Sequence, residues 1–238
     1  MGLRYKGGFY SVGQIAYDIL VYQDGYVGDV SPVALCDTPV TIEWSETDKL
    51  EPVQSGKATL RLYSDTDRQF IDLYTVKAGS VRMDVFREGS LYWSGTLDPE
   101  LYEEPFAYRD NYRVELVFSD LAVLDRVKYP GKGFVTVRDI VDNALSVSGI
   151  NYRFVEERVS TGIDESSVGT LTTDVCLLSD NFYDEDGEPM SWREVLDETL
   201  RVFSLRLIQK DGKVWLYDLN ALSALSPARI EWAGDDST

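Results

Sequence analysis

The chain has 238 residues, of which 44% are apolar, so it can form one large domain or two modest ones and is not wholly disordered. Its 41 acidic residues outnumber its 23 basic residues, and the formal charge of −18 disfavours nucleic-acid binding. Histidine is absent, which excludes Ser-His and Cys-His nucleophile pairs.

The sequence predicts neither a membrane span nor a secretory signal. No apolar stretch is long enough to cross a bilayer, and the first residues, MGLRYKGGFYSVGQ, lack the apolar core of a signal peptide. We therefore expect synthesis in a cytoplasm without a signal peptide. Cys36 and Cys176 are too few for a usual zinc site, and their apolar or small neighbours predict two buried thiols, with a disulfide left open.

The first two-thirds of the chain reads mainly as β-strands. Residues 15–22 and 40–44 are rich in β-branched and aromatic residues, and residues 57–63 alternate apolar Ala58, Leu60 and Leu62 with polar neighbours. Further strands are predicted over 112–118 and, as a hairpin turning at REGS, over 81–97. These strands predict a mainly antiparallel β-sheet.

An acid-rich stretch lies between the last two of these strands. Residues 94–110 carry five carboxylates together with Pro99 and Pro105, and they follow neither a helix nor a strand period. Prolines and acids between strands predict a solvated loop, here over 98–104, in preference to a catalytic carboxylate pair.

Helices are expected after residue 119. The sequence predicts a short helix over 119–129 and a longer one over 136–149, with Thr136 as its cap and Gly149 at its end. The best helix covers 191–203. Ser191 and Glu194 fit a capping box; Trp192, Leu196, Leu200 and Phe203 form an apolar row, and Arg193, Asp197 and Arg201 an opposite, solvated charged row.

The predicted helix over 191–203 leads directly into a hairpin. Its Asp211-Gly212 turn pairs Leu207 with Leu216 and places Ile208 beside Trp215. We expect the apolar row of the helix to pack on this hairpin. The polar segment 155–174 reads as a long loop.

The segment DNFYDEDGEP, residues 180–189, is the best candidate for a metal site. Asp180, Asp184 and Asp186 supply the clustered oxygens that calcium prefers. An EF-hand frame fails, because Phe182 and Arg193 fall at ligand positions. A plain acidic turn is the favoured interpretation, so neither a metal nor a cofactor is expected.

The order of these elements resembles bacteriophage tail proteins of the baseplate-hub or tail-tip type, in particular those of prophages in Bacteroidetes. The likeness spans roughly residues 10–220 and includes a strand end with Trp93 and Gly95 and a helix followed by an x-DG-x hairpin. It implies an α+β fold, predominantly antiparallel β, with β-barrel-like hub domains and a few short helices. The domains expected are a β-rich one over 1–130, an α+β one over 131–220, and a C-terminal tail over 221–238 that begins a truncated further domain.

The resemblance implies a non-enzymatic structural component of a virion tail. Its partners would be further copies of itself, as a trimer, and neighbouring tail subunits, without nucleic acid. Two alternatives stay open. A binding module for surface glycans or proteins would show a concave Tyr/Trp cluster, and a carboxylate-based glycosidase would show two carboxylates about 5 to 10 Å apart across a cleft.

Overall fold

The structure is a computed structural model that describes residues 1–44, 51–74, 77–98, 111–160, 170–223 and 230–232. Within these ranges the chain is mostly β-strand with four α-helices, and its sheets are rich in antiparallel pairs. It forms two compact units. The first unit consists of Met1–Ser45, Ser55–Ala122 and Gly149–Tyr152, and the second of Glu46–Gln54, Val123–Ser148 and Arg153–Thr238.

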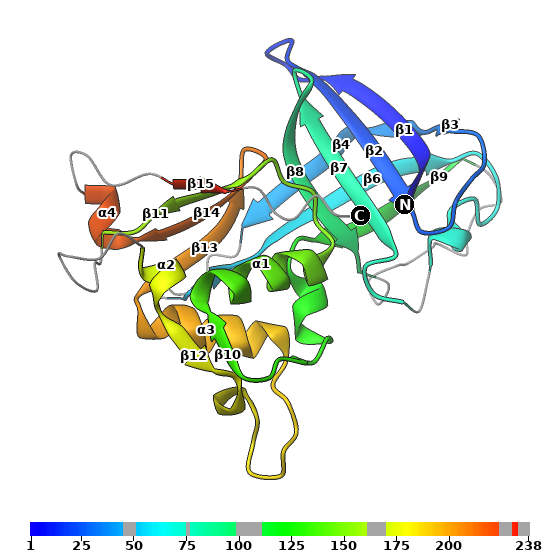
Figure 1. The fold of residues 1–238 in the computed structure, drawn as a ribbon. Coiled ribbons are helices and arrows are strands. Elements are labelled where there is room, and N and C mark those ends of the chain that lie inside the picture. The colour runs from blue at the N-terminus through cyan, green and yellow to red at the C-terminus, as the bar shows by residue number, and fades with distance from the viewer. Residues whose placement is uncertain (45–50, 75–76, 99–110, 161–169, 224–229, 233–238) are drawn as a thin grey trace. The chain divides into compact units, whose positions relative to one another are not determined.

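The first unit is built on an eight-stranded sheet with the order β3-β1-β2-β7-β8-β9-β6-β4 (Figure 1). Every neighbouring pair is antiparallel except β1 with β3. Its elements are β1 (Gly2–Tyr10), β2 (Ala16–Gln23), β3 (Ser31–Pro32), β4 (Ala34–Trp44), β6 (Gly56–Ser64), the 3₁₀ turn η1 (Ile71–Leu73), β7 (Val81–Arg87), β8 (Ser90–Leu97) and β9 (Tyr112–Ser119).

The alternating strands of the first unit bury the residues that the sequence predicts. In β6, Ala58, Leu60 and Leu62 are buried, and β9 pairs with β6 and buries Val114 and Leu116 beside them. These residues belong to a core cluster that also holds Trp93 of β8. The period of two therefore sets which face of the sheet meets the core.

Strand β1, which neighbours the end strand β3, comes close to the opposite end strand β4. A Cβ atom on Gly7 of β1 would lie 2.9 Å from the Val33 side chain and 3.3 Å from that of Leu35 in β4, so a larger residue there would displace these side chains. Among the described residues, however, no hydrogen-bonded ladder joins β3 to β4. The structure thus shows an antiparallel-rich sheet, and the barrel expected from the sequence is not shown.

A buried polar network holds residues 149–152 in the first unit. Asp84 of β7 is 1% exposed and accepts hydrogen bonds from the Ser94 hydroxyl at 2.7 Å and from the Asn151 side-chain amide at 3.0 Å. The Arg82 guanidinium lies 3.1 Å from the same carboxylate. The backbone N–H of Asn151 donates to the Ser94 hydroxyl at 2.8 Å. The buried carboxylate is therefore paired, as a buried charge must be.

The second unit is an α+β arrangement with a five-stranded sheet of order β15-β11-β14-β13-β5 and a two-stranded sheet of β10 and β12. Its strands are β5 (Val53–Gln54), β10 (Phe134–Thr136), β11 (Val155–Arg158), β12 (Cys176–Leu178), β13 (Leu205–Lys210), β14 (Lys213–Asp218) and β15 (Ile230–Trp232). Its helices are α1 (Val137–Ser148), α2 (Leu171–Asp174), α3 (Trp192–Val202), α4 (Leu219–Ser223) and the 3₁₀ turn η4 (Ser179–Phe182). The 3₁₀ turn η3 (Ala122–Asp125) begins at the boundary between the units.

The predicted hairpin after α3 is confirmed in register. Leu207 pairs with Leu216, and Ile208 pairs with Trp215. Leu205, Leu207, Val214 and Leu216 are all buried, and so is Leu196 of α3. Helix α3 contacts β13 and lies beside α1 (Figure 1). The apolar faces of helix and hairpin thus form the core of the second unit.

The segment predicted as a long loop over 155–174 is partly regular. It contains β11 and α2, while residues 161–169 lie outside the described ranges. Glu156 and Glu157 of β11 point to opposite faces of the sheet, yet each is only 1% exposed. The prediction is wrong for β11 and α2, and both acidic side chains of β11 have partners contributed by other elements.

The partners of the two β11 carboxylates can be named. Glu156 contacts Arg158 at 2.6 Å and Lys213 of β14 at 3.0 Å. Glu157 accepts from the Thr172 hydroxyl at 2.9 Å and pairs with Arg138 of α1 at 3.3 Å. Burial by itself raises the pKa of Glu156, but the hydrogen bonds and charges of Lys213 and Arg158 hold that pKa below its ordinary value.

The helix predicted over 119–129 is also wrong, because only η3 forms there. The backbone beyond it pairs with another segment. The N–H of Tyr129 donates to the Met190 carbonyl at 2.9 Å, and the N–H of Trp192 donates to the Val127 carbonyl at 2.9 Å. Residues 127–129 are therefore extended, and their carbonyl and N–H groups are not available for a helix.

The charged row predicted on α3 is only partly solvated. The Arg193 side chain donates to the Val53 carbonyl of β5 at 3.1 Å and pairs with Asp197 at 3.3 Å. Burial raises the pKa of Asp197, and the Arg193 charge opposes this rise. Arg201 is exposed as expected. Cys36 is buried but Cys176 is exposed, so the prediction of two buried thiols is wrong for Cys176; both are free cysteines.

The acid-rich stretch between β8 and β9 lies outside the described residues from 99 to 110. Only its first part is described, where the N–H of Asp98 donates to the Val117 carbonyl at 2.9 Å. The prediction of a solvated loop over 98–104 thus stays a prediction. In the described ranges, no helix is long and apolar enough to cross a membrane.

Candidate interaction surface

Helix α3 carries two apolar rows that run to its C-terminal end. The Ser191 hydroxyl accepts from the Glu194 N–H at 3.2 Å, and the Glu194 carboxylate accepts from the Ser191 N–H at 2.7 Å. The hydrogen bonds that the Glu194 carboxylate accepts from the Ser191 N–H and hydroxyl lower the pKa of Glu194. The reciprocal bonds between the two residues confirm the predicted capping box. The first is the predicted row of Trp192, Leu196, Leu200 and Phe203, and the second consists of Val195, Thr199 and Val202. It begins in the core and ends at Val202, which is 74% exposed.

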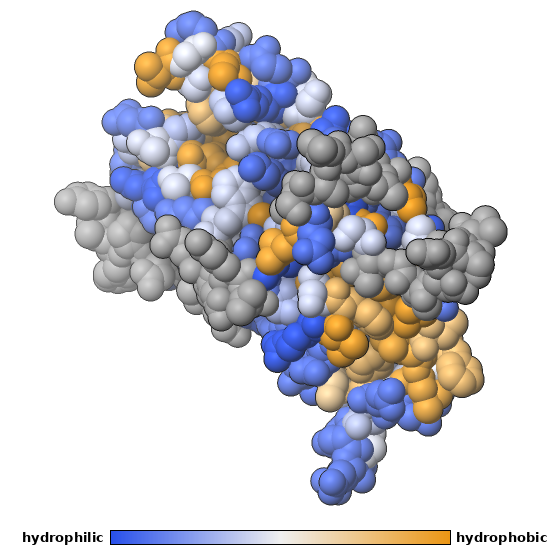
Figure 2. Space-filling view, turned by 90° about the vertical axis from the view of Figure 1, so that its left-hand side faces the viewer, coloured by the Kyte–Doolittle hydropathy of each residue, from blue (hydrophilic) through white to orange (hydrophobic). Residues whose placement is uncertain are grey.

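Apolar side chains with exposed surface lie at this end of α3 and on the β10–β12 strand pair of the same unit. Phe134 of β10 is 78% exposed and pairs with Leu178 of β12, which is 38% exposed. We call Phe134, Leu178 and Val202, together with the half-buried Leu177, Met190 and Phe203, the apolar patch. Figure 2 shows a broad hydrophobic region directly above a projecting hydrophilic segment. Exposed apolar side chains gathered in this way are typical of a protein interaction surface.

The apolar patch is hollowed beside α3. The hollow has a volume of about 210 Å³ and is lined by Leu177, Asn181, Phe182, Met190, Glu198, Thr199, Val202 and Phe203. We call it the apolar hollow. Thr199 is 2% exposed, and its Oγ1 atom is buried without a hydrogen-bond partner among the described residues. A polar atom so placed is costly to leave unpaired.

An acidic loop borders the apolar patch and projects from the second unit (Figure 1). We call its residues 184–188 the acidic arm. The Asp184 carboxylate accepts from the N–H groups of Asp186 at 3.0 Å and Glu188 at 2.8 Å, and Gly187 adopts a positive φ of 79°. Asp184 therefore shapes the turn. Glu185, Asp186 and Glu188 are exposed, and none of them pairs with a cation within the described ranges.

Aromatic contacts fix the base of the acidic arm. The ring of Tyr129 packs edge-on against Phe182 at 5.3 Å and against Trp192 at 4.9 Å between centroids. The Tyr183 hydroxyl donates to the Gly131 carbonyl at 3.0 Å, and the Tyr129 hydroxyl is 2.8 Å from that of Ser179. These contacts hold the arm in place beside the apolar patch.

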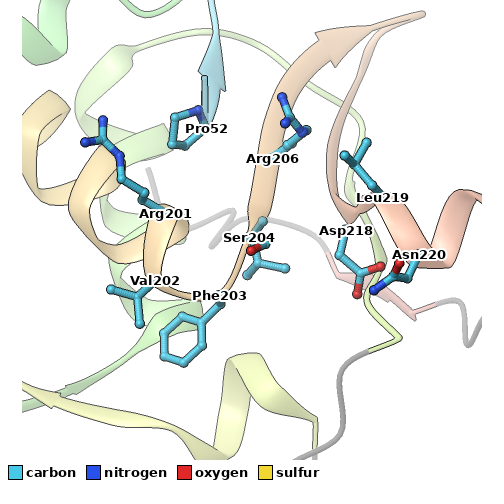
Figure 3. A pocket seen from close by; sticks show the side chains of 10 residues that line it. Pro52, Arg201, Val202, Phe203, Ser204, Arg206, Asp218, Leu219 and Asn220 are labelled. Atoms are coloured by element: carbon cyan, nitrogen blue, oxygen red, sulfur yellow. The ribbon is translucent and has the colours of Figure 1, made fainter. Parts of the chain in front are cut away.

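A larger and more polar hollow lies on the other side of Val202 and Phe203 (Figure 3). Its volume is about 630 Å³, and its lining includes Arg201, Arg206 and Asp218. Asp218 is 2% exposed and accepts from the N–H and hydroxyl of Ser160 at 2.7 and 2.9 Å. Asp218 also accepts from the N–H of Ala221 in α4, so its carboxylate serves as a helix cap.

The predicted calcium candidates are close in sequence but separate in role. Asp180 lies in η4, Asp184 shapes the arm and Asp186 is exposed on it. In the described ranges, no group of three or more His, Cys, Asp or Glu side chains is arranged to hold a metal ion.

A glycan-binding module needs exposed aromatic ring faces, and a glycosidase needs two carboxylates across a cleft. Trp215 and Phe154 of the second unit are covered by cations, since the Lys213 ammonium lies 5.3 and 4.8 Å from their ring centroids. Arg158 also lies over Trp215 at 5.3 Å. Among the described residues, each hollow is lined by a single acidic side chain, Glu198 in one and Asp218 in the other. Rings covered in this way do not favour sugar stacking, and a single carboxylate in each hollow does not favour a glycosidase.

Comparisons with known proteins give a weak likeness to solved structures only. No family model matches the chain, and no curated protein matches it. Among solved structures, the chain is similar to the prophage MuSo2 43 kDa tail protein from Shewanella oneidensis, with 17% sequence identity and a TM-score of 0.38. The aligned region covers 75% of this chain and 53% of that protein, so the chain spans about half of that protein's length.

Sequence reasoning missed most of this surface. Val202 could have been found, because it continues the spacing of Val195 and Thr199 on one side of α3. Phe134 and Leu178 could not, since their pairing joins strands far apart in the chain. The acidic arm was identified, but only as a metal candidate or a plain turn.

Proposed function

We propose that this protein is a non-enzymatic structural component of a phage or prophage tail, placed at the baseplate hub or tail tip. The observation that carries the proposal is the apolar patch, with Val202 and Phe134 more than two-thirds exposed. Monomeric proteins rarely leave such side chains gathered in the open, whereas assembly subunits bury them against neighbours. The element order that resembles tail proteins supplies the biological setting.

The proposal includes the form of the assembly. We infer that the eight-stranded sheet is a barrel-like hub domain, which the close approach of β1 and β4 at Gly7 supports. The partners are neighbouring tail subunits and further copies of the chain, arranged as a trimer in the virion tail. A ring of this kind needs a heterologous interface, in which different surfaces of neighbouring copies meet.

Co-purification tests the proposal. The full chain, carrying a tag, is co-expressed with the products of its neighbouring genes, and the complexes are analysed by native mass spectrometry. We expect other tail proteins to co-purify with the wild type but not with Val202→Asp. The control, Val12→Asp, also adds a charge at a fully exposed valine, but in the first unit. Equal complex formation by the wild type and Val202→Asp would contradict the proposed function.

A further inference from the structure

The size of the apolar hollow indicates what it receives. Its volume of about 210 Å³ lies below the roughly 300–1,000 Å³ of typical small-molecule pockets. A space of this size beside an exposed apolar patch suits one large side chain of a protein partner. Buried aromatic side chains are the usual anchors of such contacts.

The wall of the hollow indicates the chemistry of that side chain. Thr199 Oγ1 is buried and unpaired, although the surrounding wall is largely apolar. An aromatic side chain with a polar edge would fill the hollow, and a rotation of Thr199 about its Cα–Cβ bond would bring this hydroxyl to that edge. Tyrosine fits best, because its hydroxyl can both donate and accept a hydrogen bond.

The negative charge next to the hollow indicates which residues flank the anchoring side chain in the partner. Glu185, Asp186 and Glu188 are exposed without cationic partners in the described ranges, and Glu198 lines the hollow itself. Complementary charge on a partner would speed and orient docking. A second copy is a poor source of this positive charge, since each chain has 41 acidic but only 23 basic residues.

We propose that the apolar hollow binds a tyrosine of a different protein chain, in a segment whose neighbouring Lys and Arg residues contact the acidic arm. This inference rests on the proposed function and names the partner chemistry of the same surface. The apolar hollow supplies the anchor, and the acidic arm supplies selection for a basic segment.

Fluorescence anisotropy with synthetic peptides tests the proposal. The probe is a short labelled peptide with one Tyr among Lys and Arg, compared with matched peptides that carry Phe or Ser for Tyr, or Glu for the basic residues. We expect the Tyr peptide to bind the full-length protein and the Ser and Glu peptides to bind at least about fivefold more weakly. Equal binding of the Ser or Glu peptide would overturn the proposal.

Two sets of protein variants locate the binding. Glu185→Gln/Asp186→Asn/Glu188→Gln should weaken the Tyr peptide about fivefold or more at low salt, and less so at high salt. The matched control, Asp29→Asn/Asp65→Asn/Asp67→Asn, removes the same charge from exposed sites of the first unit and should change affinity less than about twofold. Equal losses in both variants would show unspecific attraction and overturn the proposal.

Thr199→Val tests the hydrogen bond without removing much volume. The Tyr peptide should bind the wild type about two- to tenfold more tightly than the Phe peptide, and the two should bind Thr199→Val equally. A difference that persists in Thr199→Val would refute the role of this hydroxyl.

Failure of this inference can be distinguished from failure of the proposed function. If Val202→Asp abolishes co-purification of tail proteins while the acidic-arm variant does not, the inference about a basic partner fails and the proposed function stands. If Val202→Asp leaves co-purification intact, the proposed function itself fails.

Discussion

The eight-stranded sheet of the first unit and the five-stranded sheet of the second bury their strands in different ways. In the first, β6 buries Ala58, Leu60 and Leu62 and alternates them with more exposed neighbours. In the second, β11 buries Val155, Glu156 and Glu157 in succession. Alternation of apolar and polar residues indicates a strand with one face in solvent. A strand that is buried on both faces shows no such alternation.

The energetic consequences of the two arrangements should differ. An apolar core residue loses its transfer free energy and leaves a cavity when it is truncated. A buried carboxylate contributes through partners, and its net contribution depends on pH and on how well those partners are satisfied. Substitutions in the two sheets can therefore test the comparison directly.

The largest effect is expected for Trp93→Ala in β8. Trp93 is fully buried in the core cluster of the first unit, so truncation should lower the free energy of unfolding by about 3–5 kcal/mol. Urea unfolding followed by circular dichroism measures this change. The control, Val12→Ala at a fully exposed position, should stay within about 0.5 kcal/mol. A loss below about 1 kcal/mol for Trp93→Ala would contradict a packed core there.

Leu196→Ala makes the same test in the apolar core of the second unit. Leu196 is fully buried beneath α3, and its truncation should cost about 2–5 kcal/mol in the same assay. Val202→Ala, on the exposed end of the same helix, serves as the control and should have little effect on stability. Comparable losses in the two variants would mean that Val202 is also buried, and would refute the apolar patch.

Glu156→Gln tests the polar arrangement of β11. At neutral pH it should cost about 1.5–3 kcal/mol, because Lys213 and Arg158 lose a charged acceptor. Glu43→Gln, at an exposed position of β4, is the control and should cost less than about 0.5 kcal/mol. No loss in Glu156→Gln would show that the ion pairs only offset their own burial.

The effect of Glu156→Gln should also depend on pH. The folded-state pKa of Glu156 lies below its ordinary value, so its stabilisation is fully present above the unfolded-state pKa of about 4.3. That stabilisation is lost as the pH falls through the folded-state pKa. The difference in unfolding free energy between wild type and variant should therefore shrink on acidification below about pH 4. A difference that grows there would contradict the direction of the shift.

The smallest effect is expected for Glu100→Gln/Glu103→Gln/Glu104→Gln. These residues lie outside the described ranges, and the sequence predicts a solvated loop. Their combined substitution should change the free energy of unfolding by well under about 1 kcal/mol. A loss of several kcal/mol would mean that these carboxylates, like those of β11, have buried partners.

Local patterns were enough to predict α3 and the hairpin that follows it. The capping box of Ser191 and Glu194 and the Asp211-Gly212 turn each lie within a few residues, so they are visible in the sequence. The register of Leu207 with Leu216 followed from the turn alone. Such elements are determined by residues close in sequence, so they can be predicted without knowledge of distant contacts.

The remaining features depend on partners far away in the sequence. In the sequence, Glu156 looks like a polar loop residue, because its ion-pair partner Lys213 lies 57 positions away and the pairing is not visible there. The helix expected over 119–129 fails because Met190 and Trp192 supply backbone partners for residues 127–129. Likewise, half of the apolar patch exists only because β10 pairs with β12. A single sequence does not reveal such pairings, so the candidate surface was found from the structure.

The interleaving of the two units along the chain has a consequence for synthesis and for fragments. The chain passes from one unit to the other at 45/46, 54/55, 122/123, 148/149 and 152/153. Asn151 must leave the ribosome before Asp84 has its amide partner, and β5 must wait for β13. Neither unit is contained in one continuous fragment, so a cut at 130/131 would deprive the N-terminal piece of Asn151 and the C-terminal piece of β5. Useful dissection of this protein therefore requires circular permutation or paired fragments expressed together.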